Sequence, residues 1–288
     1  MKTIGIYYFS GTGNTKIAAE MFRDEFVKLG CSVDLINIED ALKDPAAIQP
    51  ETYDIIGIGS QIIGFGTPIT VKRFIKLLPR VRAAKTFIFR TAGGVAPINY
   101  NASKPFIRKL SRKGYGVFHE RVFSIASNWV TGFDANVIKQ LYEATNKKIA
   151  LMCGKILTGE KRMLSTGIWL RLWMELAMPV FSWMLRFAGK DMAISKACTG
   201  CGLCIRKCPA GNIYNKNGKI KFKLSCNSCL RCVYSCPRNA MGFRLLKFFP
   251  LPGGYNIQSL LNHPDITYTA ANKTVPPFFE KYLCNEEL

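Results

Sequence analysis

The stretch TIGIYYFSGTGNT, residues 3–15, decides the fold of the first half of the chain. Residues 3–9 are apolar and partly β-branched, which predicts a buried strand. A glycine-rich turn follows, and helical spacing of the apolar residues begins at Asn14. Such a turn at the start of a helix offers unpaired backbone N–H groups and the positive end of the helix dipole. The stretch therefore predicts a strand, a phosphate-binding loop and a helix, in that order.

The residues after this stretch alternate between short apolar runs and helical patterns. This alternation predicts an α/β fold, a doubly wound parallel sheet of five strands with crossover helices, over residues 1–158. We expect strands at 3–9, 32–37, 54–60, 85–91 and 116–126, and helices at 14–29, 68–78, 102–113 and from Asp134 onward.

The phosphate loop matches one of three known types. A Walker A loop would need a lysine before a final Ser or Thr, and a dinucleotide loop would need a third glycine and a later acidic residue. Neither pattern is present. The sequence SGTGNT resembles the FMN phosphate loop of flavodoxins. The resemblance implies a flavodoxin-like fold and an FMN phosphate site made by Ser10, Gly11, Thr12, Gly13, Asn14 and Thr15.

The flavin ring is expected at the carboxyl ends of the strands, where doubly wound sheets bind their ligands. Phe65 is a candidate for stacking on the ring, Tyr100 and Trp129 are rivals, and packing in the core is the alternative for Phe65 and Trp129. The loops after the third and fourth strands supply the expected ring contacts: Ser60, Gln61, Ile62, Gly64, Phe65 and Gly66, then Thr91, Ala92, Gly93 and Gly94.

Eight of the eleven cysteines lie in two runs of the form C-x-x-C-x-x-C-x-x-x-C-P. This spacing lets one loop wrap three corners of a 4Fe-4S cluster while the fourth cysteine reaches the other cluster. It predicts two clusters and resembles the bacterial dicluster ferredoxins. One cluster is expected on Cys198, Cys201, Cys204 and Cys236, and the other on Cys226, Cys229, Cys232 and Cys208.

Structural zinc is the alternative for these cysteines. Zinc sites use two separated pairs of ligands and give no reason for a doubled run of four that ends in proline. The other three cysteines, Cys31, Cys153 and Cys284, stand alone, and we expect no chemistry from them. Cysteines clustered for metal, together with an N-terminus that resembles a strand rather than a signal peptide, predict a cytoplasmic protein.

Composition divides the chain into four parts. We expect residues 1–158 to form the flavin domain, 159–189 a linking helix, 190–245 a small α+β ferredoxin domain, and 246–288 a proline-rich tail that packs back on both domains. His263 in the tail has no other ligand-type residue beside it, so we expect a structural role for it.

The linking segment is rich in Trp, Met and Leu. Arg171, Glu175 and Arg186 interrupt it, so it is not expected to cross a bilayer. Pro179 should kink or divide the helix. The first interpretation is a helix packed between the two domains. The second is peripheral contact with an anionic membrane through residues 163–187.

The chain is strongly basic, with 40 Lys and Arg against 19 Asp and Glu and a formal charge of +21. Such a charge attracts anionic partners. No sequence signature for nucleic-acid binding is present, so none is expected. The expected partner is an acidic, ferredoxin-like redox protein or a downstream reductase. Candidate docking residues are Arg206, Lys207, Lys219, Lys221, Lys223 and Arg231.

As a whole, the chain resembles the flavodoxin–ferredoxin fusion proteins of anaerobic bacteria and archaea. The resemblance implies FMN, two 4Fe-4S clusters and electron transfer. Because clusters carry single electrons and FMN holds one or two, we expect a one-to-two-electron relay. The alternatives are a flavin-dependent reductase of a quinone-like or enone-like molecule, and a redox sensor that contacts nucleic acid. The sequence leaves the oligomeric state open.

Overall fold

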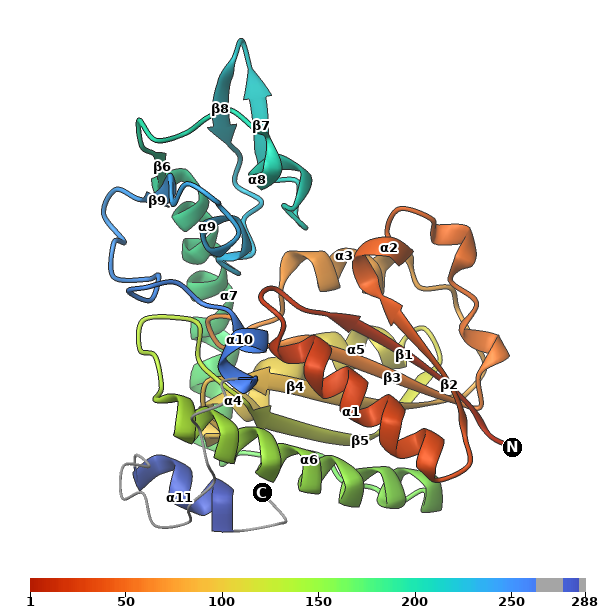
Figure 1. The fold of residues 1–288 in the computed structure, drawn as a ribbon. Helices are drawn as coiled ribbons and strands as arrows, with labels where there is room; N and C mark the ends of the chain where they lie inside the picture. The colour runs from red at the N-terminus through yellow and green to blue at the C-terminus, as the bar shows by residue number, and fades with distance from the viewer. Residues whose placement is uncertain (263–276, 285–288) are drawn as a thin grey trace.

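The computed structural model describes residues 1–262 and 277–284. His263, for which the sequence predicts a structural role, lies outside the described residues, as does part of the C-terminal tail. The described residues form a larger α/β domain and a smaller α+β domain, connected by one long helix, α7 (Figure 1).

The larger domain is built on a five-stranded parallel sheet in the order β2-β1-β3-β4-β5 (Figure 1). Each strand ends within two residues of its predicted bounds, and the predicted flavodoxin-like, doubly wound sheet is confirmed. The strand order reverses between β1 and β3, so the loops that follow these strands diverge at the carboxyl edge. The strands are β1 (Thr3–Phe9), β2 (Ser32–Asn37), β3 (Ile55–Gln61), β4 (Ala84–Ala92) and β5 (Tyr115–Ser124).

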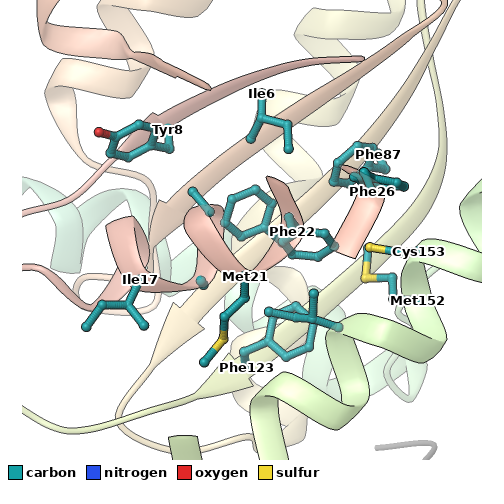
Figure 2. Close-up of a cluster of buried hydrophobic side chains, with 14 of the residues drawn as sticks. Ile6, Tyr8, Ile17, Met21, Phe22, Phe26, Phe87, Phe123, Met152 and Cys153 are labelled. Carbon is teal, nitrogen blue, oxygen red and sulfur yellow. The ribbon is translucent and has the colours of Figure 1, made fainter. Parts of the chain in front are cut away.

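Helices cover both faces of this sheet. On one face, Phe22 of α1 packs on Phe89 and Phe123 with ring centroids 4.7 and 5.9 Å apart, in the core drawn in Figure 2. On the other face, Phe74 of α3 and Phe106 of α5 are buried in a second core. Burial on both faces explains why β1 and β3 are nearly continuous apolar runs. The main helices are α1 (Asn14–Lys28), α3 (Ile69–Leu77), α5 (Lys104–Ser111) and α6 (Ala135–Thr158).

Shorter helices fill the connections of the larger domain. Asn37 caps the first of them, because its side chain accepts a hydrogen bond from the backbone N–H of Glu39. These elements are α2 (Ile38–Ala41), α4 (Pro97–Tyr100) and 3-10 turns at Pro45–Ala47, Pro50–Thr52 and Asn101–Ser103.

The smaller domain repeats one pattern twice, a cysteine loop followed by a one-turn helix. Its two antiparallel strand pairs are β6 with β9 and β7 with β8. Its core gathers around Ile213, Leu230 and Phe243. The elements are β6 (Met192–Ile194), α8 (Leu203–Arg206), β7 (Ile213–Lys216), β8 (Lys219–Phe222), α9 (Arg231–Tyr234) and β9 (Met241–Phe243).

Helix α7 (Ile168–Asp191) contacts both domains. Met174 and Met178 pack on the larger domain, and Ala188 lies in the core of the smaller one. The helix is continuous through position 179, so the expected division there does not occur. Among the described residues, none of the helices is both long and apolar enough to cross a membrane.

The chain then returns to the larger domain. Ile257, in α10 (Ile257–Leu261), is buried in the α1 core. The hydroxyl of Tyr282, in α11 (Pro277–Cys284), lies 2.7 Å from the hydroxyl of Thr145 in α6. The C-terminal segment therefore stabilises the domain that the N-terminal residues begin.

Candidate flavin and iron–sulfur sites

The phosphate loop joins β1 to α1 and is held in shape by its own hydrogen bonds. The backbone N–H of Gly13 donates to Ser10 Oγ at 3.1 Å, and Gly13 has a φ of 112°. A Cβ at this position would lie 2.6 Å from Ile257 of α10, so glycine is needed both for the turn and for the close packing.

Two neighbouring loops are tied to the phosphate loop. Asn128 Nδ2, after β5, donates to Thr12 Oγ1 at 2.6 Å. The hydroxyls of Thr15 and of Thr91, near the end of β4, lie 2.7 Å apart. Asn14 Nδ2 donates to the carbonyl of Ala126 at 2.9 Å. The loop is therefore preorganised by the ends of β4 and β5.

These loops enclose a cavity of about 250 Å³. Ten of the sixteen residues predicted for the flavin line it: Ser10, Gly11, Thr12, Asn14, Thr15, Gln61, Ile62, Thr91, Ala92 and Gly93. The others that line it are Ile63, Ala126, Ser127, Asn128, Trp129, Val130, Ser228 and Cys229.

Six predicted residues lie off the cavity lining: Gly13, Ser60, Gly64, Phe65, Gly66 and Gly94. The loop after β3 explains three of them, because it packs against α7. The ring of Phe65 lies 5.7 Å from that of Phe181, and a Cβ on Gly64 would overlap Leu185. Phe65 thus packs against α7, and Trp129 rather than Phe65 is the aromatic side chain that lines the cavity.

The residues that line the cavity suit a flavin mononucleotide. The loop at the N-terminus of α1 has backbone N–H groups and hydroxyls that suit a phosphate. Backbone and apolar groups near Ile62 and Gly93 suit a flavin ring. In the described part of the chain, Nε1 of Trp129 is buried without a hydrogen-bond partner and is a free donor at this site.

The tail also reaches this site. Tyr255 donates its hydroxyl hydrogen to Asn14 Oδ1, and Tyr234 donates to the carbonyl of Asn128 at 2.7 Å. The backbone N–H of Leu251 in turn donates to the Tyr234 hydroxyl. Two loops of the flavin cavity are therefore fixed from outside by the smaller domain and the tail.

The eight motif cysteines surround two separate cavities in the smaller domain. The structure brings together the sets expected from exchange of the fourth ligand, although no three described Cys, His, Asp or Glu side chains converge on a single-ion site. Cys208 belongs to the first motif but lies with three cysteines of the second. Cys236 belongs to the second motif but lies with three cysteines of the first. The sets are Cys208, Cys226, Cys229 and Cys232, and Cys198, Cys201, Cys204 and Cys236.

The thiols suit iron–sulfur ligation. Backbone N–H groups point at sulfur: Asn212 N lies 3.2 Å from Cys208 Sγ, and Ser228 N lies 3.2 Å from Cys226 Sγ. Burial raises the pKa of the Cys226 thiol to about 12, so this thiol keeps its proton until a metal replaces it. Soft thiolate donors in sets of four match a 4Fe-4S cluster.

The second cysteine set lies directly against the phosphate loop. A Cβ on Gly11 would lie 2.8 Å from the Cβ of Cys229, and both Ser228 and Cys229 line the flavin cavity. Sequence patterns did not predict these two residues at the flavin cavity, because they follow the loop by more than two hundred positions and belong to the other domain.

Arg231 holds this junction together. Its Nε donates to the carbonyl of Gly11 at 2.8 Å, and its Nη2 donates to the carbonyl of Ser10. The same guanidinium forms an ion pair with Glu39, and both side chains are about four-fifths buried. We predicted Arg231 as part of a docking face, but the structure commits it to the contact between the two domains.

Comparisons with known proteins agree with the smaller domain's chemistry. Residues 197–241 match the family described as a 4Fe-4S dicluster domain. The sequence matches none of the curated proteins.

The solved structures similar to this chain include flavodoxins, which match about half of it. Flavodoxin 1 from Bacillus cereus is 18% identical over 54% of this chain and 97% of its own, with a TM-score of 0.41. A Megasphaera elsdenii flavodoxin is 23% identical over 41% and 84%, with a TM-score of 0.34. A WrbA-like flavodoxin from Agrobacterium tumefaciens is 13% identical over 56% and 100%, with a TM-score of 0.38. Because these TM-scores are low, the assignment of the fold rests on the strand order of the sheet.

The strand order and the dicluster match define the class of protein. The chain combines a flavodoxin-like domain with a 4Fe-4S dicluster domain, as in a flavodoxin–ferredoxin fusion. It is an iron–sulfur electron-transfer protein.

Proposed function

We propose that the chain is an internal electron relay that connects an external one-electron donor to FMN through two 4Fe-4S clusters. The observation that carries the proposal is the position of Cys229, which lines both the flavin cavity and the cavity of the second cysteine set. A cluster held by Cys229 would lie beside a flavin in the first cavity.

The phosphate loop is the proposed anchor for FMN. Asn128 and Ala126 already fix Thr12 and Asn14, so binding costs little further ordering of the loop. The absence of a side chain on Gly11 lets Cys229 approach, and Arg231 holds two carbonyls of the loop by hydrogen bonds. These contacts support a fixed distance between the two cofactors.

The first cysteine set supplies the proposed entry point. Cys198 and Cys201 are exposed, whereas Cys226 and Cys229 are only partly accessible. A cluster passes one electron at a time and FMN holds one or two, so the bound groups would supply a one-to-two-electron conversion. Electrons would therefore enter at the exposed set and reach the flavin through the inner set.

An acidic, ferredoxin-like protein is the proposed external partner. Arg206, Lys207, Lys219, Lys221 and Lys223 are all exposed on the smaller domain. Arg206 lies beside the exposed set, because its Nη1 donates to the carbonyl of Cys201 at 3.0 Å. A basic surface around the entry point would speed association with an acidic donor.

A flavin-dependent reductase of small molecules has less support. The residues that line the described cavity include no Asp, Glu, His, Lys or Tyr beside the ring position that could supply a proton. Cys229 is the one titratable side chain there, and the proposed cluster occupies it.

The relay is tested by anaerobic reductive titration of the full, cofactor-loaded chain. Two one-electron clusters and one two-electron flavin should take up about four electrons per chain. In stopped-flow mixing with a reduced acidic ferredoxin, absorbance loss from the clusters should precede absorbance loss from the flavin. Uptake of only two electrons, or flavin reduction before cluster reduction, would refute the relay.

A further inference from the structure

One face of α7 is an apolar stripe that lies open to solvent. Its exposed side chains recur at helical spacing: Trp169, Trp173, Leu176, Val180, Trp183 and Phe187. Trp169 is 82% exposed and Leu176 is 79% exposed. At 1.5 Å per residue the stripe is about 27 Å long. Three of the four tryptophans in the chain lie on it.

The opposite face of α7 is buried against the two domains. Met174 and Met178 pack on Ala102 of the larger domain, and Ala188 packs in the smaller one. The rotation of the helix is therefore fixed by buried contacts at both ends. The exposed stripe faces away from both domains, and no residue in the described part of the chain buries it.

A polar flank of α7 lies between the stripe and the buried face, and cations gather along it, with Arg186 nearest to the stripe. Lys72 Nζ donates to Ser182 Oγ of α7 at 3.3 Å. Burial lowers the pKa of Lys72, and the positive charges of Arg186 and Lys109 nearby lower it further. A row of like charges of this kind suits an anionic surface.

Further toward the start of α7 the flank holds one acidic side chain. Glu175 pairs with Arg171 at 3.3 Å and with Arg108 at 3.4 Å. Two cations surround this carboxylate, so the flank stays net positive along its length. The chain as a whole has a formal charge of +21.

We propose that α7 docks the protein on the surface of an anionic lipid bilayer, with the apolar stripe in the headgroup region and the cationic flank against lipid phosphates. Tryptophan is the side chain best suited to this depth, because its ring is apolar and its N–H is polar. An amphipathic helix with such a face lies in the plane of the membrane.

Other occupants fit less well. Protein interfaces mix polar groups into their apolar area, whereas this stripe is apolar throughout apart from the indole N–H groups. A second copy of the chain would bring the same cationic flank to the contact, and in a symmetric dimer like charges would face each other. Anionic lipid satisfies the stripe and the flank together.

Vesicle flotation with the full, cofactor-loaded chain tests this. The wild type should float with vesicles of phosphatidylcholine and phosphatidylglycerol, and much less with phosphatidylcholine alone. Trp169→Ser/Trp173→Ser should weaken binding to the anionic vesicles at least about tenfold. Lys109→Gln/Arg186→Gln should weaken the same binding several-fold and reduce its salt dependence.

The matched control changes apolar side chains of similar exposure away from α7. Leu77 and Leu151 are 47% and 44% exposed, and Leu77→Ser/Leu151→Ser should float like the wild type. A measurement without mutations uses vesicles whose acyl chains carry bromine, which should quench the tryptophan fluorescence of the wild type.

Two outcomes would overturn the proposal. One is a wild type that neither floats with anionic vesicles nor shows quenching by brominated lipid. The other is a wild type that sediments as a dimer without lipid and becomes a monomer in Trp169→Ser/Trp173→Ser, because the stripe would then bind a second copy.

Discussion

The two cysteine motifs have the same spacing but differ in the residues between their cysteines and in the backbone strain at these residues. In the first motif, Gly200 and Gly202 adopt φ values of 72° and 70°. In the second, Ser228 and Leu230 hold the same left-handed conformation at 54° and 59°, which costs about 1–2 kcal/mol for each residue with a side chain. The second motif therefore accepts backbone strain where the first avoids it.

Contacts of the second motif offset this strain. Ser228 Oγ donates to the carbonyl of Leu185 at 3.0 Å, and Leu230 is buried in the domain core. Asn227 accepts from the backbone N–H of Ile69, and its Nδ2 donates to Thr70 Oγ1 at 2.7 Å. The residues between the cysteines thus show which motif faces the flavin domain.

The largest expected effect comes from removing a ligand at the junction. Cys229→Ala should abolish the second cluster and slow flavin reduction by a protein donor by about a hundredfold, because the ligand nearest the flavin is lost. EPR spin counting and stopped-flow absorbance measure the two effects. Cys284→Ala, at an exposed cysteine outside both sets, should match the wild type. Equal flavin reduction in Cys229→Ala would contradict the proposed order of cofactors.

The next largest effect is expected from replacing the buried arginine of the second motif. Arg231→Gln breaks a mostly buried ion pair with Glu39 and two bonds to the phosphate loop. We expect it to destabilise the junction by about 2–4 kcal/mol and to weaken FMN binding at least tenfold. Denaturation monitored by flavin fluorescence and an FMN titration check this.

The exposed arginine of the first motif is the control for Arg231. Arg206→Gln should change the free energy of unfolding by no more than about 0.5 kcal/mol. If both variants bound FMN equally well, Arg231 would not be the residue that ties the domains together.

A smaller effect is expected from crowding the contact between the domains. Gly11→Ala places a methyl group 2.8 Å from Cys229 Cβ and should cost about 1–3 kcal/mol. Weaker FMN binding and an altered EPR signal of the second cluster should accompany the loss. Gly154→Ala, in α6 with no atom near the added methyl, should instead stabilise the chain by up to about 1 kcal/mol.

The smallest effect concerns the donor. Lys219→Gln/Lys221→Gln/Lys223→Gln should slow reduction by an acidic ferredoxin several-fold at low salt, because the surface charges steer association. The difference should fade as salt rises. Lys76→Gln/Lys85→Gln, on the larger domain, should leave the rate unchanged. If the triple variant were reduced as fast as the wild type at low salt, the proposed docking surface would be contradicted.

Local patterns predicted the elements whose contacts are local. The loop from Ser10 to Thr15 folds between β1 and α1 as its glycines indicate, and the cysteine spacing grouped Cys208 and Cys236 with the opposite motifs. In both cases the chain itself sets the geometry within a few residues. The strands β1 and β3 were equally readable, because burial on both faces leaves nearly unbroken apolar runs.

Contacts between distant segments were not readable. Phe65 follows β3 as a flavin contact would, yet it packs on Phe181 because α7 crosses that loop. Arg231 resembled a surface cation within a basic module, and only the fold shows Glu39 beside it. The one signal in the sequence was that Ser228 and Leu230 replace the glycines found at the matching positions of the first motif.

The central claim is that the cluster held by Cys208, Cys226, Cys229 and Cys232 lies beside FMN in the cavity of the larger domain. An anomalous difference map at the iron edge, from crystals of the cofactor-loaded chain, tests it most directly. We predict two iron peaks, one in each cysteine set, and a flavin between the phosphate loop and Trp129 with the second peak as its neighbour. A flavin outside this cavity, or iron absent from the set around Cys229, would contradict the account.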